Sequence, residues 1–205
     1  MATKNAVNKT RRVEREAKLK RRRTMRYVTW AALIVAGIAI VGALVWFFSQ
    51  SASTVQAAGE VVPVNSRDHI TLGSDPGPYS SDPPAGGHHY PSTYDPGFYS
   101  PQDVLALPKF YSGYLVHNQE HGYVIFWYNC QADPKINCTD LQNAIKQVIN
   151  ENNSFKVIGF PWPSMKQPLA ITAWGRILRL DKVDLPTMRA FYHTYVDKGP
   201  EQTPN

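Results

Sequence analysis

The longest hydrophobic run of the chain lies near its N-terminus. Residues 27–48, YVTWAALIVAGIAIVGALVWFF, are 22 consecutive positions without a charge. As a helix this segment extends for about 33 Å, close to the hydrocarbon thickness of a bilayer. Aromatic residues lie near both of its ends, as is typical of segments that meet the two membrane interfaces. The pattern predicts one transmembrane helix at residues 27–48 that is retained as a signal anchor.

A cleaved signal peptide is the alternative interpretation of the same run. In the following segment STVQAAGE, Val55 and Ala57 resemble the small residues of a cleavage site. The run is longer than the roughly 7–15 apolar residues of a usual signal peptide core. We therefore favour the uncleaved anchor.

Beyond residue 110 the hydrophobic pattern predicts short regular elements. The segments GYLVH and YVIFWY are rich in β-branched and aromatic residues, which indicates two strands joined by a turn around residues 118–122. TDLQNAIKQVINENN then repeats apolar residues at helical spacing behind Thr139 or Asp140, either of which suits an N-cap.

The last third of the outer domain is also predicted to form strands followed by a helix. FKVIGF predicts a third strand, and LAITAWGRILRL predicts one long strand bulged at Gly175 or two short strands. DLPTMRAFYHTYVDKG predicts a helix with Asp184 as N-cap and Gly199 as its stop. The order β-β-α-β-β-α predicts an α+β domain in which a small antiparallel sheet is covered by two helices.

Residues 61–109 have a different composition, dominated by Pro, Gly, Ser and Tyr. Regular elements are not expected there. Because aromatic side chains normally pack against other groups, the many tyrosines argue against a solvated linker. We predict an ordered, irregular arm wrapped on the domain.

Charge divides the chain into two parts. Residues 1–26 carry eleven Lys or Arg and two Glu, a local charge of +9, whereas the rest of the chain is at −3. A basic segment beside an anchor is attracted to anionic headgroups and is retained in the cytoplasm. We predict a basic cytoplasmic tail at residues 1–26, a linker at 49–60 and an extracytoplasmic domain at 61–205. Membrane lipid is the expected partner of the tail, and nucleic acid is not.

Cys130 and Cys138 are the only cysteines, and both belong to the part assigned to the oxidising side. Closing the short loop between them would stabilise the fold by roughly 2.5 kcal/mol in the chain-entropy model. A thiolate metal site lacks further ligands at the usual spacings. We therefore predict a disulfide.

Histidines gather in the first half of the outer domain: His69, His88, His89, His117 and His121. In an extended chain the side chains of His117 and His121 would be about 13 Å apart, too far to share an ion. In a turn their Cβ atoms come within about 6 Å. Asn118 and Gly122 favour the turn, so the two imidazoles can converge.

The same segment, HNQEH, matches the H-x-x-E-H pattern of inverzincin peptidases, in which both histidines bind zinc and the glutamate activates water. That motif requires a sustained helix, whereas strand-like sequence surrounds it here. A metal-dependent hydrolase is therefore only an alternative.

Three segments, DPPAGGHHYP, YLVHNQEHGYVIFWY and LAITAWGRILRL, resemble the bacterial family called domain of unknown function 3105, whose members are typically anchored or secreted. The pattern PP-x-x-G-x-HY and V-HN-x-EHG falls on Pro83, Pro84, Gly87, His89, Tyr90, Val116, His117, Asn118, Glu120, His121 and Gly122. This chain departs from the pattern at Ala85, Gly86, His88 and Gln119. The resemblance implies a shared site but no assigned activity, and it leaves open whether His88 or His89 faces that site.

Three hypotheses follow for the outer domain. The first is a zinc or copper site formed by His89, His117 and His121, with His69 or His88 as a further ligand and Glu120 as a ligand or an orienting group. The second is an accessory subunit of a membrane protein complex, in which the histidines form a structural hydrogen-bond network. The third is an enzyme, either the hydrolase above or a His/Glu acid–base catalyst.

Overall fold

The computed structural model describes residues 20–21, 25–46 and 59–201 of the 205-residue chain. One helix in the N-terminal part, Met25–Trp46, is long and apolar enough to cross a membrane, a property that N-terminal signal sequences share. The basic tail before residue 20, the linker up to residue 58 and the alternative cleavage site lie outside the described residues. The chain forms two compact units, Met1–Ser51 and Ala52–Asn205.

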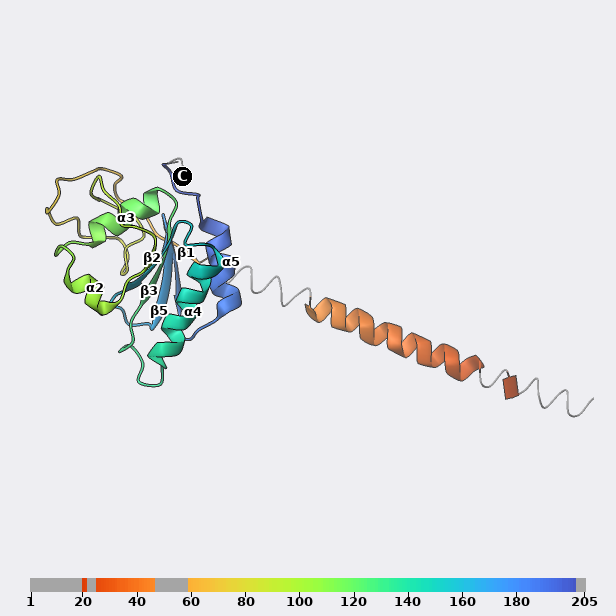
Figure 1. The fold of residues 1–205 in the computed structure, drawn as a ribbon. Helices are drawn as coiled ribbons and strands as arrows, with labels where there is room; N and C mark the ends of the chain where they lie inside the picture. The colour runs from red at the N-terminus through yellow and green to blue at the C-terminus, as the bar shows by residue number, and fades with distance from the viewer. Residues whose placement is uncertain (1–19, 22–24, 47–58, 202–205) are drawn as a thin grey trace, which may run out of the picture. The chain divides into compact units, whose positions relative to one another are not determined.

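The second unit is built on one six-stranded sheet (Figure 1). Its strand order is β1-β6-β5-β3-β4-β2, with the bounds β1 Glu60–Val61, β2 Gly97–Phe98, β3 Val124–Tyr128, β4 Val157–Pro161, β5 Leu169–Ala173 and β6 Arg176–Leu180. The α+β class predicted from the sequence is confirmed. The expectation of a wholly antiparallel sheet is wrong, because β4 runs parallel to both β2 and β3. Parallel strands need a crossover connection, and the helix between β3 and β4 carries the chain back so that both strands start at the same edge of the sheet.

Helices lie on both faces of the sheet (Figure 1). The helices of this unit are α2 Pro101–Leu105, α3 Ser112–Glu120, α4 Cys138–Glu151 and α5 Leu185–Tyr195. Side chains alternate along β3, so Val124 and Phe126 pack with α4 and α5, whereas Ile125 and Trp127 pack with residues of α2, α3 and the arm. The sheet therefore separates two hydrophobic layers, and the predicted arm covers one of them.

The arm is ordered and is joined to the sheet by backbone hydrogen bonds. The expectation that residues 61–109 contain no regular elements is wrong, because β2 and α2 lie within them. The amide of Val62 donates to the carbonyl of Gly175, and the amide of Gly175 donates to the carbonyl of Ala85. Gly175 lies in the turn between β5 and β6, so the LAITAWGRILRL segment forms two short strands. Tyr90, in the middle of the arm, is buried, as expected for an aromatic residue that packs.

The main difference from the sequence prediction is α3, which occupies residues predicted to be a strand and a turn. Nearly all of this helix is buried, including its polar residues from His117 to Glu120. The Asn118 side chain, for example, donates to the Tyr94 carbonyl and accepts from the Tyr94 amide. Because both sides of α3 are covered, its sequence lacks the polar face that normally reveals a helix.

Two smaller differences concern helix ends. The N-cap of α4 is Asn137, not Thr139 or Asp140, because its side-chain oxygen accepts hydrogen bonds from both of those backbone amides. Helix α5 begins after Asp184 as predicted but ends at Tyr195, well before Gly199. The segment after α5 lies across the end of α3, where the amide of Glu201 donates to the carbonyl of Glu120.

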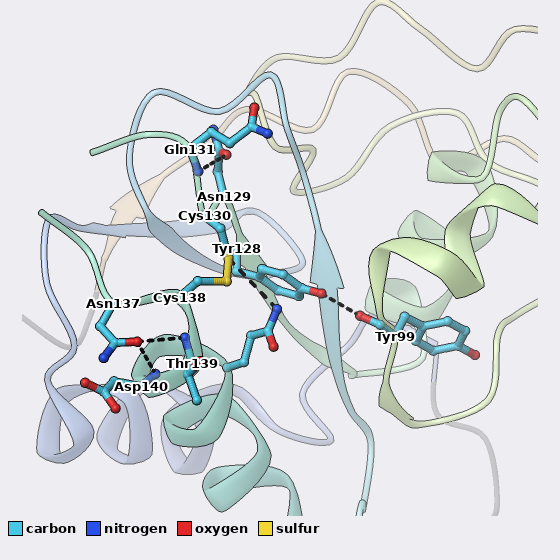
Figure 2. Close-up of a disulfide and its surroundings, with 10 residues drawn as sticks. Tyr99, Tyr128, Asn129, Cys130, Gln131, Asn137, Cys138, Thr139 and Asp140 are labelled. Atoms are coloured by element: carbon cyan, nitrogen blue, oxygen red, sulfur yellow. Dashed lines mark hydrogen bonds between the residues drawn. A yellow bond between two sulfur atoms is a disulfide. The ribbon is translucent and has the colours of Figure 1, made fainter. Parts of the chain in front are cut away.

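The two cysteines lie at disulfide distance (Figure 2). Cys130 follows β3, and Cys138 is the first residue of α4. The bond therefore ties the end of a central strand to the start of the helix that covers it.

Candidate metal centre

Helix α3 positions the first two groups of the candidate site. His117 and Glu120 are three residues apart, a spacing that places side chains on the same face of a helix. Helix α3 ends at Glu120 and His121 is its C-cap. Gly122 then adopts the left-handed conformation that turns the chain into β3. The HNQEH segment is therefore mainly helical rather than a loop between strands.

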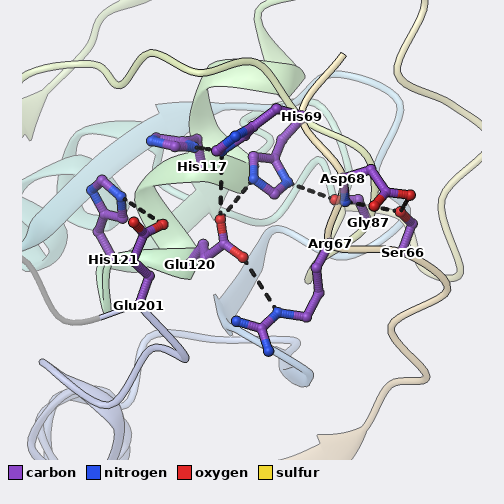
Figure 3. Close-up of polar contacts among 10 residues, drawn as sticks. Ser66, Arg67, Asp68, His69, Gly87, His117, Glu120, His121 and Glu201 are labelled. Atoms are coloured by element: carbon purple, nitrogen blue, oxygen red, sulfur yellow. Dashed lines mark hydrogen bonds and ion pairs between the residues drawn. The ribbon is translucent and has the colours of Figure 1, made fainter.

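The arm brings two further histidines to this face. His69 and His89 pair through an isolated parallel bridge, in which the Ile70 amide donates to the His89 carbonyl and the His89 amide donates to the Asp68 carbonyl. The 19 residues between the two histidines thus form a loop whose ends are held together beside α3. Figure 3 shows His69 in contact with both Glu120 and the ring of His117.

The four side chains meet closely enough to bind one ion. Each of His69, His89, His117 and Glu120 offers one ligand atom, and all of these atoms lie within 4.8 Å of one another. His89 Nε2 lies 2.7 Å and His69 Nε2 lies 3.8 Å from Glu120 Oε2, and His69 Nε2 lies 3.1 Å from His117 Nδ1. Ligands at about 2.0–2.1 Å from a tetrahedral zinc ion are roughly 3.3 Å apart. The separations in this structure, from 2.7 Å to at most 4.8 Å, lie on both sides of that value.

The orientation of the His89 ring follows from its neighbours. Its Nδ1 lies 2.8 Å from the carbonyl oxygen of Gly87, which can only accept, so Nδ1 carries a proton. The fully buried Nε2 has no hydrogen bond of good geometry, although it lies 2.7 Å from the Glu120 carboxylate. Nε2 is therefore the His89 atom that faces the Glu120 carboxylate, and a cation bound between the two would compensate the buried negative charge.

Glu120 uses its two oxygens differently. Oε2 faces His69 and His89, whereas Oε1 lies 3.5 Å from Nε of Arg67 (Figure 3). The Glu120 side chain is only 4% exposed. A buried carboxylate requires compensating charge, and here Arg67 lies on one side while the histidines leave the other side available to a cation.

Burial keeps His117 neutral. Loss of solvation, and after it the positive charge that His121, His89 and His69 can carry, together lower the pKa of His117 from 6.5 to about 3. Metal ligation needs an unprotonated imidazole, so His117 is ready to bind an ion at neutral pH.

Two of the histidines predicted as ligands lie outside the cluster. His88 is exposed, whereas its neighbour His89 is fully buried, so His89 is the member of the pair that faces the site. The His121 ring lies beside the His117 ring, with centroids 4.3 Å apart, but its Nε2 lies 3.4 Å from Glu201 Oε2. The structure thus brings together four of the six residues proposed from the sequence.

This geometry differs from the peptidase pattern that the sequence suggested. An H-x-x-E-H site uses both histidines as ligands and leaves the glutamate free to activate water. Here Glu120 lies among the ligand atoms and His121 pairs with a residue of the C-terminal segment.

Sequence reasoning missed two residues that act on the cluster. Arg67 contacts Glu120, and the carbonyl of Gly87 orients His89. Arg67 precedes His69 by two positions, and in an extended chain such residues point to the same side. That spacing was the available signal for Arg67. The role of the Gly87 carbonyl has no signal in the sequence, because every residue has a backbone carbonyl.

A cavity of about 290 Å³ lies elsewhere, at the carboxyl ends of β3 and β4. Its lining is Pro101, Val104, Leu105, Tyr111, Tyr128, Asn129, Cys130, Gln131, Pro161 and Pro163. This lining contains no Asp, Glu, His, Lys or Arg and shares no residue with the cluster. The cavity is therefore separate from the candidate metal centre and offers no charged or imidazole side chain.

Comparison with known proteins gives a family but no activity. No curated protein and no solved structure matches the chain. A family model described as protein of unknown function (DUF3105) matches residues 74–205, which contain His89, His117 and Glu120 but not His69. The match spans more than half of the chain and agrees with the resemblance seen in the histidine segments. The chain belongs to the DUF3105 family of proteins of unknown function.

Proposed function

We propose that this chain is a single-pass membrane protein whose outer domain binds a transition metal ion, zinc or copper, through His69, His89, His117 and Glu120. The observation that carries the proposal is the convergence of three imidazoles and one carboxylate within 4.8 Å from separate parts of the chain. Imidazole suits zinc and copper, whereas calcium and magnesium prefer sites made of oxygen ligands.

The orientation of His89 also supports metal binding. Histidine ligands commonly donate their second ring N–H to a carbonyl or carboxylate, which fixes the tautomer and directs the other nitrogen to the metal. The Gly87 carbonyl has this role toward His89. Arg67 likewise engages the carboxylate oxygen of Glu120 that faces away from the histidines.

An extracytoplasmic location is part of the proposal. The apolar helix is followed by a domain with a cysteine pair at disulfide distance, which suits an oxidising compartment, and it is preceded by a segment of charge +9. Protease added to intact cells should digest the outer domain and spare an epitope placed before residue 26. The intact mass of the purified protein separates an anchor from a signal peptide that is removed.

The test of metal binding uses the full-length chain in detergent, stripped with a chelator and then titrated with Zn(II) or Cu(II). We expect one ion per chain for wild type and for His88→Ala, whose exposed side chain is the matched control. His89→Ala should lose the ion. Because His89 is buried and this variant risks misfolding, His69→Ala at the exposed edge provides a second test and should bind more weakly. Absence of both stoichiometric metal and metal-dependent thermal stabilisation in wild type would refute the proposal.

A structural role in a membrane complex remains the second candidate. The contact between the His69 and His117 rings and the contact between Arg67 and Glu120 support a hydrogen-bond network that holds the arm on α3. In that case, the chain should co-purify with a larger membrane assembly, and the association should be unaffected by metal removal.

A further inference from the structure

The proposed metal centre is closed on one side and open on the other. His89 is fully buried and the Glu120 side chain is 4% exposed, whereas the His69 side chain is 46% exposed. An additional ligand from solvent can therefore approach past His69. Four-coordinate metal sites that accept a fifth ligand do so from such an accessible side.

The guanidinium of Arg67 lies at the same open side with unused donors. Its side chain is 58% exposed, and its Nε contacts Glu120 Oε1 at 3.5 Å, the far limit of a hydrogen bond. Arginine normally engages a carboxylate through two parallel N–H bonds. Here the terminal amino groups make no hydrogen bond to Glu120 or to any other residue in the part of the chain that the structure describes.

The charge of this region favours an anion once a divalent ion is bound. The ion and Glu120 together carry +1, and Arg67 adds another positive charge. Carboxylates of the neighbouring segments are engaged elsewhere, since Asp68 accepts a hydrogen bond from the Ser66 hydroxyl and Glu201 pairs with His121. Figure 3 shows the Asp68 carboxylate turned toward Ser66 and away from Glu120.

We infer that the open side of the metal centre binds a small oxyanion, a carboxylate or a phosphate. One oxygen of this ligand would bind the metal, and a second would accept hydrogen bonds from the terminal amino groups of Arg67. Planar, bidentate recognition of carboxylate and phosphate is the interaction that arginine provides better than lysine. The inference rests on the proposed metal site and names the class of ligand that this site accepts.

The test uses the full-length chain in phosphatidylcholine nanodiscs, loaded with Co(II), whose visible absorption responds to changes in its ligands. Acetate and inorganic phosphate are titrated separately at constant ionic strength. Wild type should show a saturable spectral change with at least one of the two anions. Arg67→Ala, compared at a Co(II) concentration that saturates its own site, should need about tenfold more anion for the same change, as expected for loss of a hydrogen bond to a charged group. Arg67→Lys should recover only part of the affinity.

Arg179→Ala is the matched control, because Arg179 forms a surface ion pair with Glu60 on an edge strand. It should behave as wild type. Nanodiscs containing phosphatidylglycerol distinguish a lipid phosphate from a free anion. If these nanodiscs change the Co(II) spectrum before any anion is added, and Arg67→Ala abolishes that change, the bound anion is a lipid phosphate. Bound Co(II) with no response to either anion or to lipid, or with equal responses in wild type and Arg67→Ala, would overturn the inference but leave the metal site standing. Failure to take up Co(II) would overturn both.

Discussion

Glu120→Gln removes the carboxylate of the candidate metal centre while preserving the size of the side chain. Glu120 is the sole acidic member of the group formed with His69, His89 and His117. Glutamine keeps an oxygen that accepts hydrogen bonds but lacks the negative charge that attracts a cation. We expect the variant to fold and to bind zinc or copper much more weakly.

The size of the effect follows from the burial of this side chain. Breaking a buried charge pair by removal of one partner costs about 3–5 kcal/mol. At about 1.4 kcal/mol per tenfold, metal affinity should fall by roughly two to three and a half orders of magnitude. Metal at a hundredfold excess over the Kd stabilises wild type by about 2.7 kcal/mol, and a domain of this size should then unfold about 5–11 °C higher.

The assay is thermal unfolding followed by tryptophan fluorescence across a metal titration. Glu151→Gln is the control, because Glu151 is a surface carboxylate paired with Arg189 and should leave the metal response unchanged. The variant Glu120→Gln should need at least a hundredfold more metal, roughly, for the same rise in Tm. An equal metal response in Glu120→Gln and wild type would refute the assignment of Glu120 as a ligand. A lower Tm that is the same with and without metal would favour the hydrogen-bond network instead.

Three further predictions concern the fold. In Gly113→Ala the added Cβ would lie 2.6 Å from ring carbons of Tyr90, so the free energy of unfolding should fall by about 1–3 kcal/mol. An unchanged denaturant midpoint would contradict the packing described for α3. Serine at both cysteines should lower stability by about 2.5 kcal/mol, and reductant should then destabilise wild type but not the variant. Hydrogen bonds from Arg189, the larger cause, and from Gln147 lower the pKa of Glu151 from 4.5 to about 2. The stability that these contacts add to the fold is therefore fully present above pH 4.5 and is lost as the pH falls through about 2. Stability curves of wild type and Glu151→Gln should therefore converge in acid, and parallel curves would exclude this linkage.

Some elements could be predicted from the sequence because they depend on neighbouring residues alone. An uninterrupted apolar run of membrane length, the amphipathic pattern of α4 and the Asp184 N-cap of α5 are local features. The strands β3, β4, β5 and β6 were also located from β-branched and aromatic composition. The cysteine pair was found for the same reason, since a short loop holds the two residues close in any fold.

The helical state of α3 and the choice of residues that form the site depend on contacts between distant parts of the chain. The strand-like segment before Gly122 is a helix because the sheet and the arm cover both of its sides and bond its polar residues. The parallel pairing of β4 likewise depends on the path of α4 between two strands.

The sequence by itself determined that histidines and a glutamate were available in the outer domain, and that a helical turn could bring two of them together. Only the tertiary structure decided that His89 rather than His88 faces inward, that His69 joins the cluster and that His121 pairs with Glu201. In an irregular arm, the direction of a side chain is set by hydrogen bonds to segments far away in the sequence. Local periodicity carries no record of those contacts, so the convergence of ligand atoms becomes visible only when the arm is placed on α3.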